Sequence, residues 1–474
     1  MNVTYTDGTS QTIADQPFAQ GTQGAIYKSA DGKHVVKLYN PQSITPDRAK
    51  QIEGIIGQYN AVGKEPNKDP YWDELYTWPD KVVRSPRLGV RMRFVGDLTR
   101  MDHFFYKVAY DNLPLEKKGW WIGRVAAAIK LARAVHHMST LGLCHSDLSD
   151  KNVLVDAFDG RMTILDCDSI VIPGVIPADV LGTPGYMAPE LVTRKQREPS
   201  VVTDRHALAV LLYRWLLYKH PLYGPKQHSL DTEIDEALMQ GEKALWIEHP
   251  TDTSNRPKPL RLTTEMLTPR MKHLFHRAFV EGLHTPGLRP TADLWEDALV
   301  EMFDRILPCA NPACAQRFFV AQQVPPLRCT NCNTPLSFPA AIPFLRLTHP
   351  VQRRPGVWQQ ENDAPFGRYV VGWPERPLYA WHTQPSIKPS PDAAQGIRLD
   401  VRPVAFIRYD PVTRMWYLQN DTLPNLRAGK GNDPHINWKP VPPGQMVPLE
   451  AGVHLQLGDE HVARRASVEM MPVK

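Results

Sequence analysis

The sequence has little cysteine and no long apolar run. Six cysteines in 474 residues are too few for a disulfide framework. The most apolar stretch, residues 207–218, is shorter than a membrane span and contains Arg214. Residues 2–7 lack the basic-then-apolar pattern of a secretory signal. These absences predict a cytoplasmic protein without a membrane partner.

Neither sign of charge dominates the chain. The 55 Lys and Arg residues nearly balance 50 Asp and Glu residues, which leaves a formal charge of +5. Nucleic-acid binders concentrate Lys and Arg on one face, so this dilute charge predicts no nucleic-acid partner. The apolar share of 42% and the charged share of 22% exclude a largely disordered chain. The length predicts about two to four domains.

The character of the sequence changes along the chain. Residues 1–115 mix strand-like runs with one helix signal, in which Thr45 can cap the helix and Pro46 occupies its first turn. Amphipathic helical patterns dominate residues 120–305. A sheet-rich segment followed by a helical one predicts an α+β fold up to residue 305.

The rest of the chain is richer in proline. A Pro-rich connector spans about residues 335–365, and short apolar runs follow at 404–409, 415–419 and 453–457. Short strand-like runs separated by Pro and Gly predict a small all-β domain.

Two glycines, Gly21 and Gly24, precede a strand-like run that carries Lys37. Phosphate groups need closely approaching backbone amides, which Gly permits, and a cation nearby. Taken alone, two glycines this close together are more often an ordinary hairpin turn.

Three later residues supply the remaining chemistry of phosphoryl transfer. That reaction needs a carboxylate to orient the acceptor hydroxyl and oxygen ligands to hold magnesium on the phosphates, and Asp147, Asn152 and Asp166 follow in that order. Residues 182–190 then read GTPGYMAPE. With these motifs in this order, residues 15–305 resemble a eukaryotic-like Ser/Thr protein kinase.

The resemblance implies a bilobal kinase fold over residues 1–305, with an N-lobe to about residue 95 and a C-lobe from about residue 97. It implies transfer of the γ-phosphoryl group of ATP to a protein hydroxyl. In the N-lobe it implies backbone contacts from the glycine loop to phosphate, a lysine on the α and β phosphates, a helix glutamate paired with that lysine, and a hinge across the adenine pocket. The residues that match these positions are Gly21, Gly24, Lys37, Glu53, Arg93, Phe94 and Val95.

In the C-lobe the resemblance implies that Asp147 is the catalytic base and that Asn152 and Asp166 bind Mg²⁺. Thr183 resembles the residue typical of Ser/Thr specificity. Three further matches imply structural roles: a buried ion pair that locks the helical lobe, and a carboxylate that holds the backbone of the catalytic loop. These residues are Glu190, Arg289 and Asp204.

Four residues depart from the kinase pattern. Ala19 stands where the first Gly of the phosphate loop is expected, which stiffens the loop but leaves the two closest glycines in place. Ser146 replaces the Arg that receives a phosphate on the activation segment, which favours partner-controlled or constitutive activity. Ser149 stands where a Lys neutralises the transferring phosphoryl group. Asp168 replaces a Gly and restricts the backbone after Asp166, which fits a fixed metal-ligating conformation.

Two alternative functions stay open. A pseudokinase scaffold that binds nucleotide and recruits partners is motivated by Ser146 and Ser149. Small-molecule phosphotransferases share the His-small-Asp-Leu-Ser-x-x-Asn pattern, but residues 182–190 resemble the peptide-docking part of protein kinases and argue against that family.

Four cysteines cluster between residues 306 and 338. The pairs Cys309-x4-Cys314 and Cys329-x2-Cys332 have the spacing of two knuckles around one tetrahedral zinc. Two disulfides or four free thiols are the alternatives. The segment is predicted to be a zinc ribbon that serves as a structural clip or docking module.

A Pro-rich linker over residues 339–365 is expected to lead to a β-sandwich over residues 366–474. Residues 447–458 resemble the closing strands of a forkhead-associated (FHA) domain. The expected phosphate-binding loops are not recognisable, so a phosphate-independent docking domain and a phosphothreonine reader are the two alternatives.

Together, the kinase, zinc ribbon and FHA-like segments resemble the kinase of the bacterial TerY phosphorylation triad. That resemblance implies a signalling role with two partners, a TerY-type von Willebrand factor A domain protein and a metal-dependent Ser/Thr phosphatase.

Overall fold

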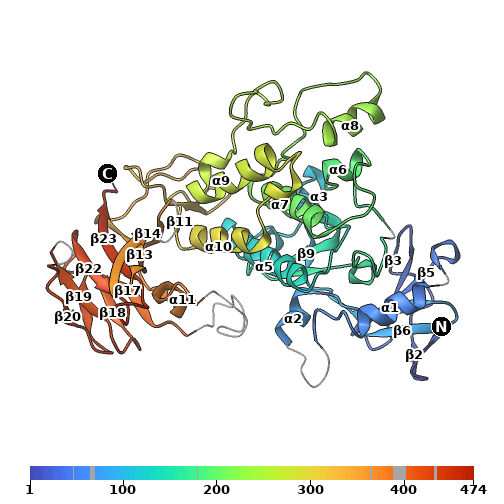
Figure 1. Cartoon of the computed structure of the whole chain (residues 1–474), viewed down its shortest axis with the longest axis horizontal. Helices are drawn as coiled ribbons and strands as arrows, with labels where there is room; N and C mark the ends of the chain where they lie inside the picture. The colour runs from blue at the N-terminus through green and yellow to red at the C-terminus, as the bar shows by residue number, and fades with distance from the viewer. Residues whose placement is uncertain are drawn as a thin grey trace. The chain divides into compact units, whose positions relative to one another are not determined.

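The computed structural model describes residues 1–45, 47–63, 70–178, 180–362, 366–387, 402–431 and 435–473 (Figure 1). The chain divides into two compact units. Unit 1 comprises Met1–Gly119, Ala126–Arg261 and Leu274–Glu296, and unit 2 comprises Trp120–Val125, Leu262–His273 and Asp297–Lys474. Among the described residues, none of the helices is both long and apolar enough to cross a membrane.

Unit 1 opens with a seven-stranded antiparallel sheet of order β2-β1-β6-β7-β5-β4-β3. Its strands are β1 (Asn2–Tyr5), β2 (Ser10–Thr12), β3 (Ala19–Gln20), β4 (Gly24–Lys28), β5 (His34–Tyr39), β6 (Lys81–Ser85) and β7 (Gly89–Arg93). Side chains of β5 alternate between two apolar clusters, because successive residues of a strand point to opposite faces. Val36 and Leu38 join one cluster, while Val35 and Tyr39 join the cluster that contains Ile52 of helix α1.

Helix α1 (Arg48–Ile56) packs against β6 and begins after Asp47 rather than at the predicted cap Thr45 (Figure 1). Pro46 lies outside the described residues. Ile52 and Ile55 are buried, as the apolar periodicity of the sequence predicted. The predicted helix therefore exists, but it begins later in the chain than the sequence suggested.

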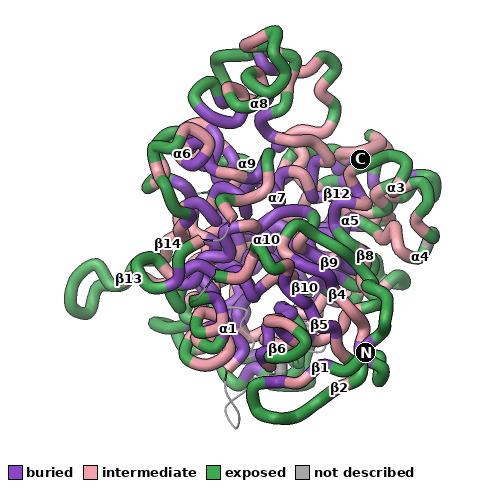
Figure 2. The backbone as a smooth tube through the Cα atoms, turned by 90° about the vertical axis from the view of Figure 1, so that its right-hand side faces the viewer, coloured by how far each residue is buried: buried purple, intermediate pink, exposed green. Residues whose placement is uncertain are grey.

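Helices dominate the chain from about residue 107 to residue 303, as predicted. They are α3 (Lys107–Asn112), α4 (Leu115–Lys118), α5 (Trp121–Thr140), α6 (Pro189–Val192), α7 (Val201–Leu217), α8 (Thr232–Gln240), α9 (Pro269–His276) and α10 (Ala292–Phe303). A further short helix, α2 (Pro70–Leu75), precedes them in the sheet-rich segment, where the sequence predicted α1 alone. A small sheet of order β10-β9-β8 accompanies them, from β8 (Thr99–Arg100), β9 (Val153–Val155) and β10 (Met162–Ile164). Strand β10 is buried along its whole length, and the turn that follows it is therefore anchored in the core (Figure 2).

Unit 2 is rich in strands. A hairpin pairs β11 (Ile306–Pro308) with β12 (Phe318–Val320), and two larger sheets follow. The seven-stranded sheet contains β13 (Ile342–Arg354), β14 (Val357–Asn362), β15 (Arg368–Val371), β19 (Arg427–Lys430), β20 (Lys439–Pro440), β22 (Val453–Gln456) and β23 (Arg465–Met471); the four-stranded sheet contains β16 (Arg376–Leu378), β17 (Ala405–Asp410), β18 (Met415–Asn420) and β21 (Met446–Pro448). Helix α11 (Ala380–Thr383) follows β16. The predicted β-rich C-terminal region is confirmed.

The prediction of a linker over residues 339–365 is wrong for most of its length, because much of this segment lies in strands. Strand β13 occupies residues 342–354 and pairs with β14, β15 and β23 in its sheet. Phe344, Leu345 and Leu347 are at most 1% exposed. The prolines of this segment suggested a connector, but the apolar side chains between them have enough buried area to hold a strand.

The cysteine segment and the β-sheets share one hydrophobic core. Leu307, Cys314 and Phe319 belong to the same buried cluster as Leu345 and Leu455. Residues 306–338 are therefore packed onto the sheets of unit 2 and do not form a separate domain with its own core.

Candidate active site

Lys37 on β5 and Asp166 after β10 meet inside unit 1. The Lys37 Nζ atom lies 2.6 Å from Asp166 Oδ1 and 3.0 Å from Asp168 Oδ2. Only 4% of Lys37 is exposed, so its ammonium group is held by charged partners in place of water. Asp166 adopts a left-handed backbone with φ of 62°, a conformation that Asp tolerates better than most residues.

Glu53 is not the partner of Lys37, contrary to the sequence-based expectation. Glu53 is exposed on α1, whereas among the described residues the Lys37 ammonium contacts Gln23, Asp166 and Asp168. Helix α1 instead sends Arg48 toward Asp168, with 3.8 Å between Arg48 Nη2 and Asp168 Oδ2. The physical reason is helical geometry: Ile52 and Ile55 face the core, and a residue directly after Ile52 is turned about 100° away from it.

The predicted glycine loop is a hairpin between β3 and β4. Gly21 donates its amide to the Gly24 carbonyl at 2.9 Å, and a Cβ on Gly24 would lie 2.4 Å from the Leu38 carbonyl oxygen. Gly24 is therefore required by the close approach of β5. Gln23, which the sequence reading did not single out, places its side-chain oxygen 3.1 Å from Lys37 Nζ and brings the loop to the lysine.

Asp147 and Asn152 are joined within one loop. The Asn152 amide nitrogen donates to the Asp147 carbonyl at 2.8 Å and to Asp147 Oδ2 at 2.9 Å. The hydroxyl of Thr183 donates to the other carboxylate oxygen, Oδ1, at 2.6 Å. The segment 182–190 is thus connected directly to Asp147. Ser149 is fully buried, while Lys151 is exposed.

The expected hinge residues lie at the end of β7 and directly after it. Arg93 donates from Nη2 to the Asp73 carbonyl at 2.7 Å. Phe94 donates its amide to Lys33, and its ring lies edge-on to Phe18 at 5.8 Å between centroids. Val95 is partly buried. Arg93 is the last residue of β7, and Phe94 and Val95 lie between β7 and β8. In the described part of the chain, none of the three forms a hydrogen bond or ion pair with Lys37 or Asp166.

Two supporting interactions predicted from the sequence are confirmed. Asp204 on α7 accepts the amides of His145 and Ser146 at 2.6 and 3.2 Å, which fixes the start of the catalytic loop. Arg289 makes a two-pronged contact with Glu190, with both nitrogen–oxygen distances at 2.7 Å. Bidentate pairs of this kind combine charge with geometric specificity.

The Glu190–Arg289 pair gives a stability prediction. Arg289→Met is expected to lower the free energy of unfolding by about 3–5 kcal/mol, because Glu190 would be left as a buried charge without its partner. Chemical denaturation measures this change. Lys107→Gln is the control, since its pair with Asp111 is exposed and such pairs contribute about 0–1 kcal/mol. Equal effects of the two substitutions would contradict the prediction.

The segment after Thr183 is fixed by side chains of the helical region. Gly185 donates its amide to Gln240 Oε1 at 2.6 Å, and the Gly185 carbonyl accepts from His220 Nε2 at 2.8 Å. Arg214 contacts the Tyr186 hydroxyl and lies 3.0 Å from Asp150 Oδ2. These contacts attach residues 185 and 186 to side chains of the helical region.

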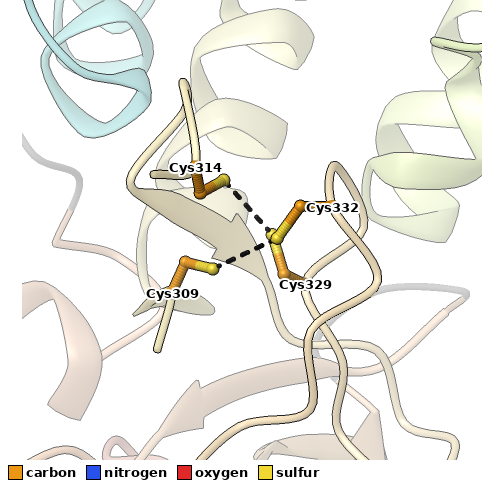
Figure 3. A group of neighbouring side chains, drawn as sticks. All are labelled: Cys309, Cys314, Cys329 and Cys332. Carbon is orange, nitrogen blue, oxygen red and sulfur yellow. Dashed lines mark hydrogen bonds between the residues drawn. The ribbon is translucent and has the colours of Figure 1, made fainter. Parts of the chain in front are cut away.

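The four clustered cysteines point their sulfur atoms at one another (Figure 3). The Sγ atoms of Cys309 and Cys332 are 3.5 Å apart, those of Cys314 and Cys329 are 3.8 Å apart, and all four lie within 4.8 Å of one another. Thiolates about 2.3 Å from a tetrahedral zinc are about 3.8 Å apart. The cysteines are free, and bonded sulfurs would be about 2.05 Å apart, so this geometry fits a metal better than two disulfides.

Residues 107–281 match the family model described as protein kinase domain. The serine/threonine-protein kinase AtPK2/AtPK19 of Arabidopsis thaliana is 30% identical over 209 residues, which cover 44% of this chain and 41% of the relative. The serine/threonine-protein kinase Sgk1-B of Xenopus laevis is 26% identical over 203 residues, 42% of this chain and 43% of the relative. The chain spans less than half the length of these curated relatives. Residues 107–281 are thus similar to protein kinase domains, and the relatives named here are Ser/Thr kinases.

Proposed function

We propose that the protein is an ATP-dependent Ser/Thr protein kinase that transfers the γ-phosphoryl group to a hydroxyl of a protein substrate. The observation that carries this proposal is the convergence of a buried lysine with a carboxylate 129 residues away, at 2.6 Å. Such a pair provides a cation for phosphate next to an oxygen ligand for magnesium. The kinase-domain match and the Ser/Thr kinases among its relatives support the same activity.

The residues assigned to ATP and magnesium fit those groups chemically. Asp166 offers a carboxylate, and the amide nitrogen of Asn152 is directed to Asp147, so the Asn152 amide oxygen is the atom that can ligate a metal. We assign Asp147 as the base for the acceptor hydroxyl and Lys37 as the phosphate contact. The backbone of Gly21 and Gly24, together with Arg93, Phe94 and Val95, completes the proposed nucleotide site.

For the C-terminal region we propose a zinc-binding module followed by an FHA-like docking sandwich. The close approach of the four cysteine sulfurs, all within 4.8 Å of one another, supports the first assignment, and the two antiparallel sheets around one core support the second. A cytoplasmic bacterial module with a TerY-type von Willebrand factor A domain protein and a Ser/Thr phosphatase is the setting we propose for this kinase.

Labelled ATP separates the proposed activity from its alternatives. Incubation with magnesium and a generic protein acceptor is expected to place phosphate on protein, and Lys37→Met is expected to abolish that label. Nucleotide binding without transfer would favour the pseudokinase scaffold. Transfer to aminoglycosides or other small hydroxyl compounds, with none to protein, would identify a small-molecule phosphotransferase.

The contacts of residues 183–186 predict activity without prior phosphorylation. Hydrogen bonds hold this segment, and their side-chain partners are Asp147, Gln240, His220 and Arg214. Because none of these bonds needs a phosphate group, phosphatase-treated protein is expected to keep its activity within about twofold. The measurement is an initial rate, with mass spectrometry to verify that the protein carries no phosphate. A lag that disappears after preincubation with ATP would contradict the prediction.

A further inference from the structure

Four side chains form a buried cluster in unit 1, namely Lys37, Tyr39, Arg48 and Asp168. None of these residues is more than 4% exposed, and Asp168 is fully buried. One Asp168 oxygen, Oδ2, lies 3.0 Å from Lys37 Nζ and accepts the Tyr39 hydroxyl at 2.5 Å. Arg48 Nη2 lies 3.8 Å from the same oxygen and 3.3 Å from the Asp168 carbonyl.

We infer that Asp168 is the positioning carboxylate that holds Lys37 for the nucleotide phosphates, and that Tyr39 and Arg48 hold Asp168. The inference rests on the proposed kinase function and deepens it. The sequence-based expectation assigned this task to Glu53 on α1. In the structure, the helix contributes a cation to the cluster and the carboxylate comes from the turn after Asp166.

The two carboxylates near Lys37 differ in exposure. The side chain of Asp166 is 32% exposed and can turn its oxygens toward a metal ion. The side chain of Asp168 is 0% exposed and is bounded by Tyr39 and Arg48, so it has no such freedom. When Asp166 ligates magnesium, Asp168 is the carboxylate that stays with Lys37.

Charge balance supports this division. Two cations of the cluster, Lys37 and Arg48, face two carboxylates, Asp168 within the cluster and Asp166 beside it, so the formal charges of these four groups cancel when all are ionised. The Tyr39 ring adds a further contact, with Lys37 Nζ 5.5 Å and the Arg48 guanidinium carbon 5.0 Å from its centroid. A buried cation without a carboxylate would be costly, which ties the position of Lys37 to Asp168.

Asp168→Asn is the main test, because it keeps the shape of the side chain and its contact with Tyr39 but removes the charge. The full-length variant is expected to bind Mg·ATP about tenfold or more weakly and to have a KM for ATP raised by a similar factor. Direct titration with Mg·ATP and steady-state kinetics measure the two effects. A side chain that only stabilises the fold would leave both values unchanged in protein shown to be folded.

Glu53→Gln is measured beside it, since the structure places Glu53 outside the cluster. Its expected effect on ATP affinity is less than about twofold. Should Asp168→Asn prevent folding, the double variant Arg48→Gln with Asp168→Asn removes one cation and one carboxylate together. Its remaining cluster is again neutral, and it is expected to fold while still binding ATP about tenfold more weakly than the native protein.

The outcomes separate this inference from the proposed function. Native affinity for ATP in folded Asp168→Asn or in the double variant would overturn the role of Asp168, as would a tenfold loss in Glu53→Gln. If the native protein binds ATP but transfers no phosphate, the proposed function fails while the affinity measurements still decide the inference. If the native protein binds no ATP, both are overturned.

Discussion

Asp147→Asn is expected to lower kcat by about 10²–10⁴-fold, because it removes the group that accepts the proton of the attacking hydroxyl. The substitution keeps the size and most of the polar contacts of the side chain. Thr183 donates to one oxygen of Asp147 and Asn152 to the other. In the variant, Asn152 can still donate to the new amide oxygen and the Thr183 hydroxyl can accept from the new amide nitrogen, so the loop geometry is expected to survive. A radiometric assay with saturating Mg·ATP and protein acceptor measures kcat directly.

The affinity for ATP provides the internal control for this variant. Among the described residues, the Lys37 ammonium hydrogen-bonds to Gln23, Asp166 and Asp168 and not to Asp147, so the dissociation constant for Mg·ATP should change by less than about threefold. Asp111→Asn is a matched substitution on α3, where the carboxylate is half exposed and forms an ion pair with Lys107. Phosphotransfer at the native rate by Asp147→Asn would remove Asp147 from the reaction.

The part of the site that the sequence predicted is the part encoded in short motifs. Asp147 and Asn152 lie five residues apart, and one loop with a single 3-10 turn brings them together. Local spacing of this kind determines local geometry, so sequence reasoning placed both residues correctly in one loop. The pairing of Lys37 with Asp166 could be predicted only from the order of several motifs along the chain, since no periodicity connects residues so far apart.

The part that the sequence did not predict depends on packing between distant segments. Asp168 pairs with Tyr39 and Arg48 across 129 and 120 residues. Apolar periodicity identified the buried face of α1 through Ile52 and Ile55, but it cannot tell which polar residue at the border of that face reaches a charge elsewhere. Glu53 was therefore assigned the contact with Lys37 that Asp168 makes, whereas the residue of α1 that reaches Asp168 is Arg48.

Domain boundaries were misjudged for a related reason. Proline content suggested a linker over residues 339–365, although Pro343 and Pro350 both sit in β13 opposite residues of neighbouring strands. Proline removes one backbone donor but leaves the carbonyl and the strand-compatible φ angle. The apolar residues between these prolines were the better signal, because burial of their side chains outweighs the loss of two hydrogen bonds.

Removal of metal from the four cysteines is expected to unfold the cysteine segment and to loosen the sheets packed on it. Structural zinc contributes about 10–16 kcal/mol of apparent binding free energy in small domains, which is comparable to the whole stability of a typical domain. Cys314 and Cys329 belong to the hydrophobic core that also contains Leu345 and Leu455, so the loss should spread beyond residues 306–338.

Zinc content and hydrogen exchange test this prediction together. Native protein should hold one zinc per chain by mass spectrometry, and a strong chelator or Cys329→Ser should raise amide exchange in residues 306–338 and in β13. The sheet of unit 1 should keep its protection, because the described residues of its two apolar clusters all belong to unit 1. Cys144→Ala is the matched control, since Cys144 is buried outside the cluster and its loss should leave the zinc content at one per chain. Absence of zinc from the native protein, or unchanged exchange after chelation, would show that packing alone holds the four cysteines together.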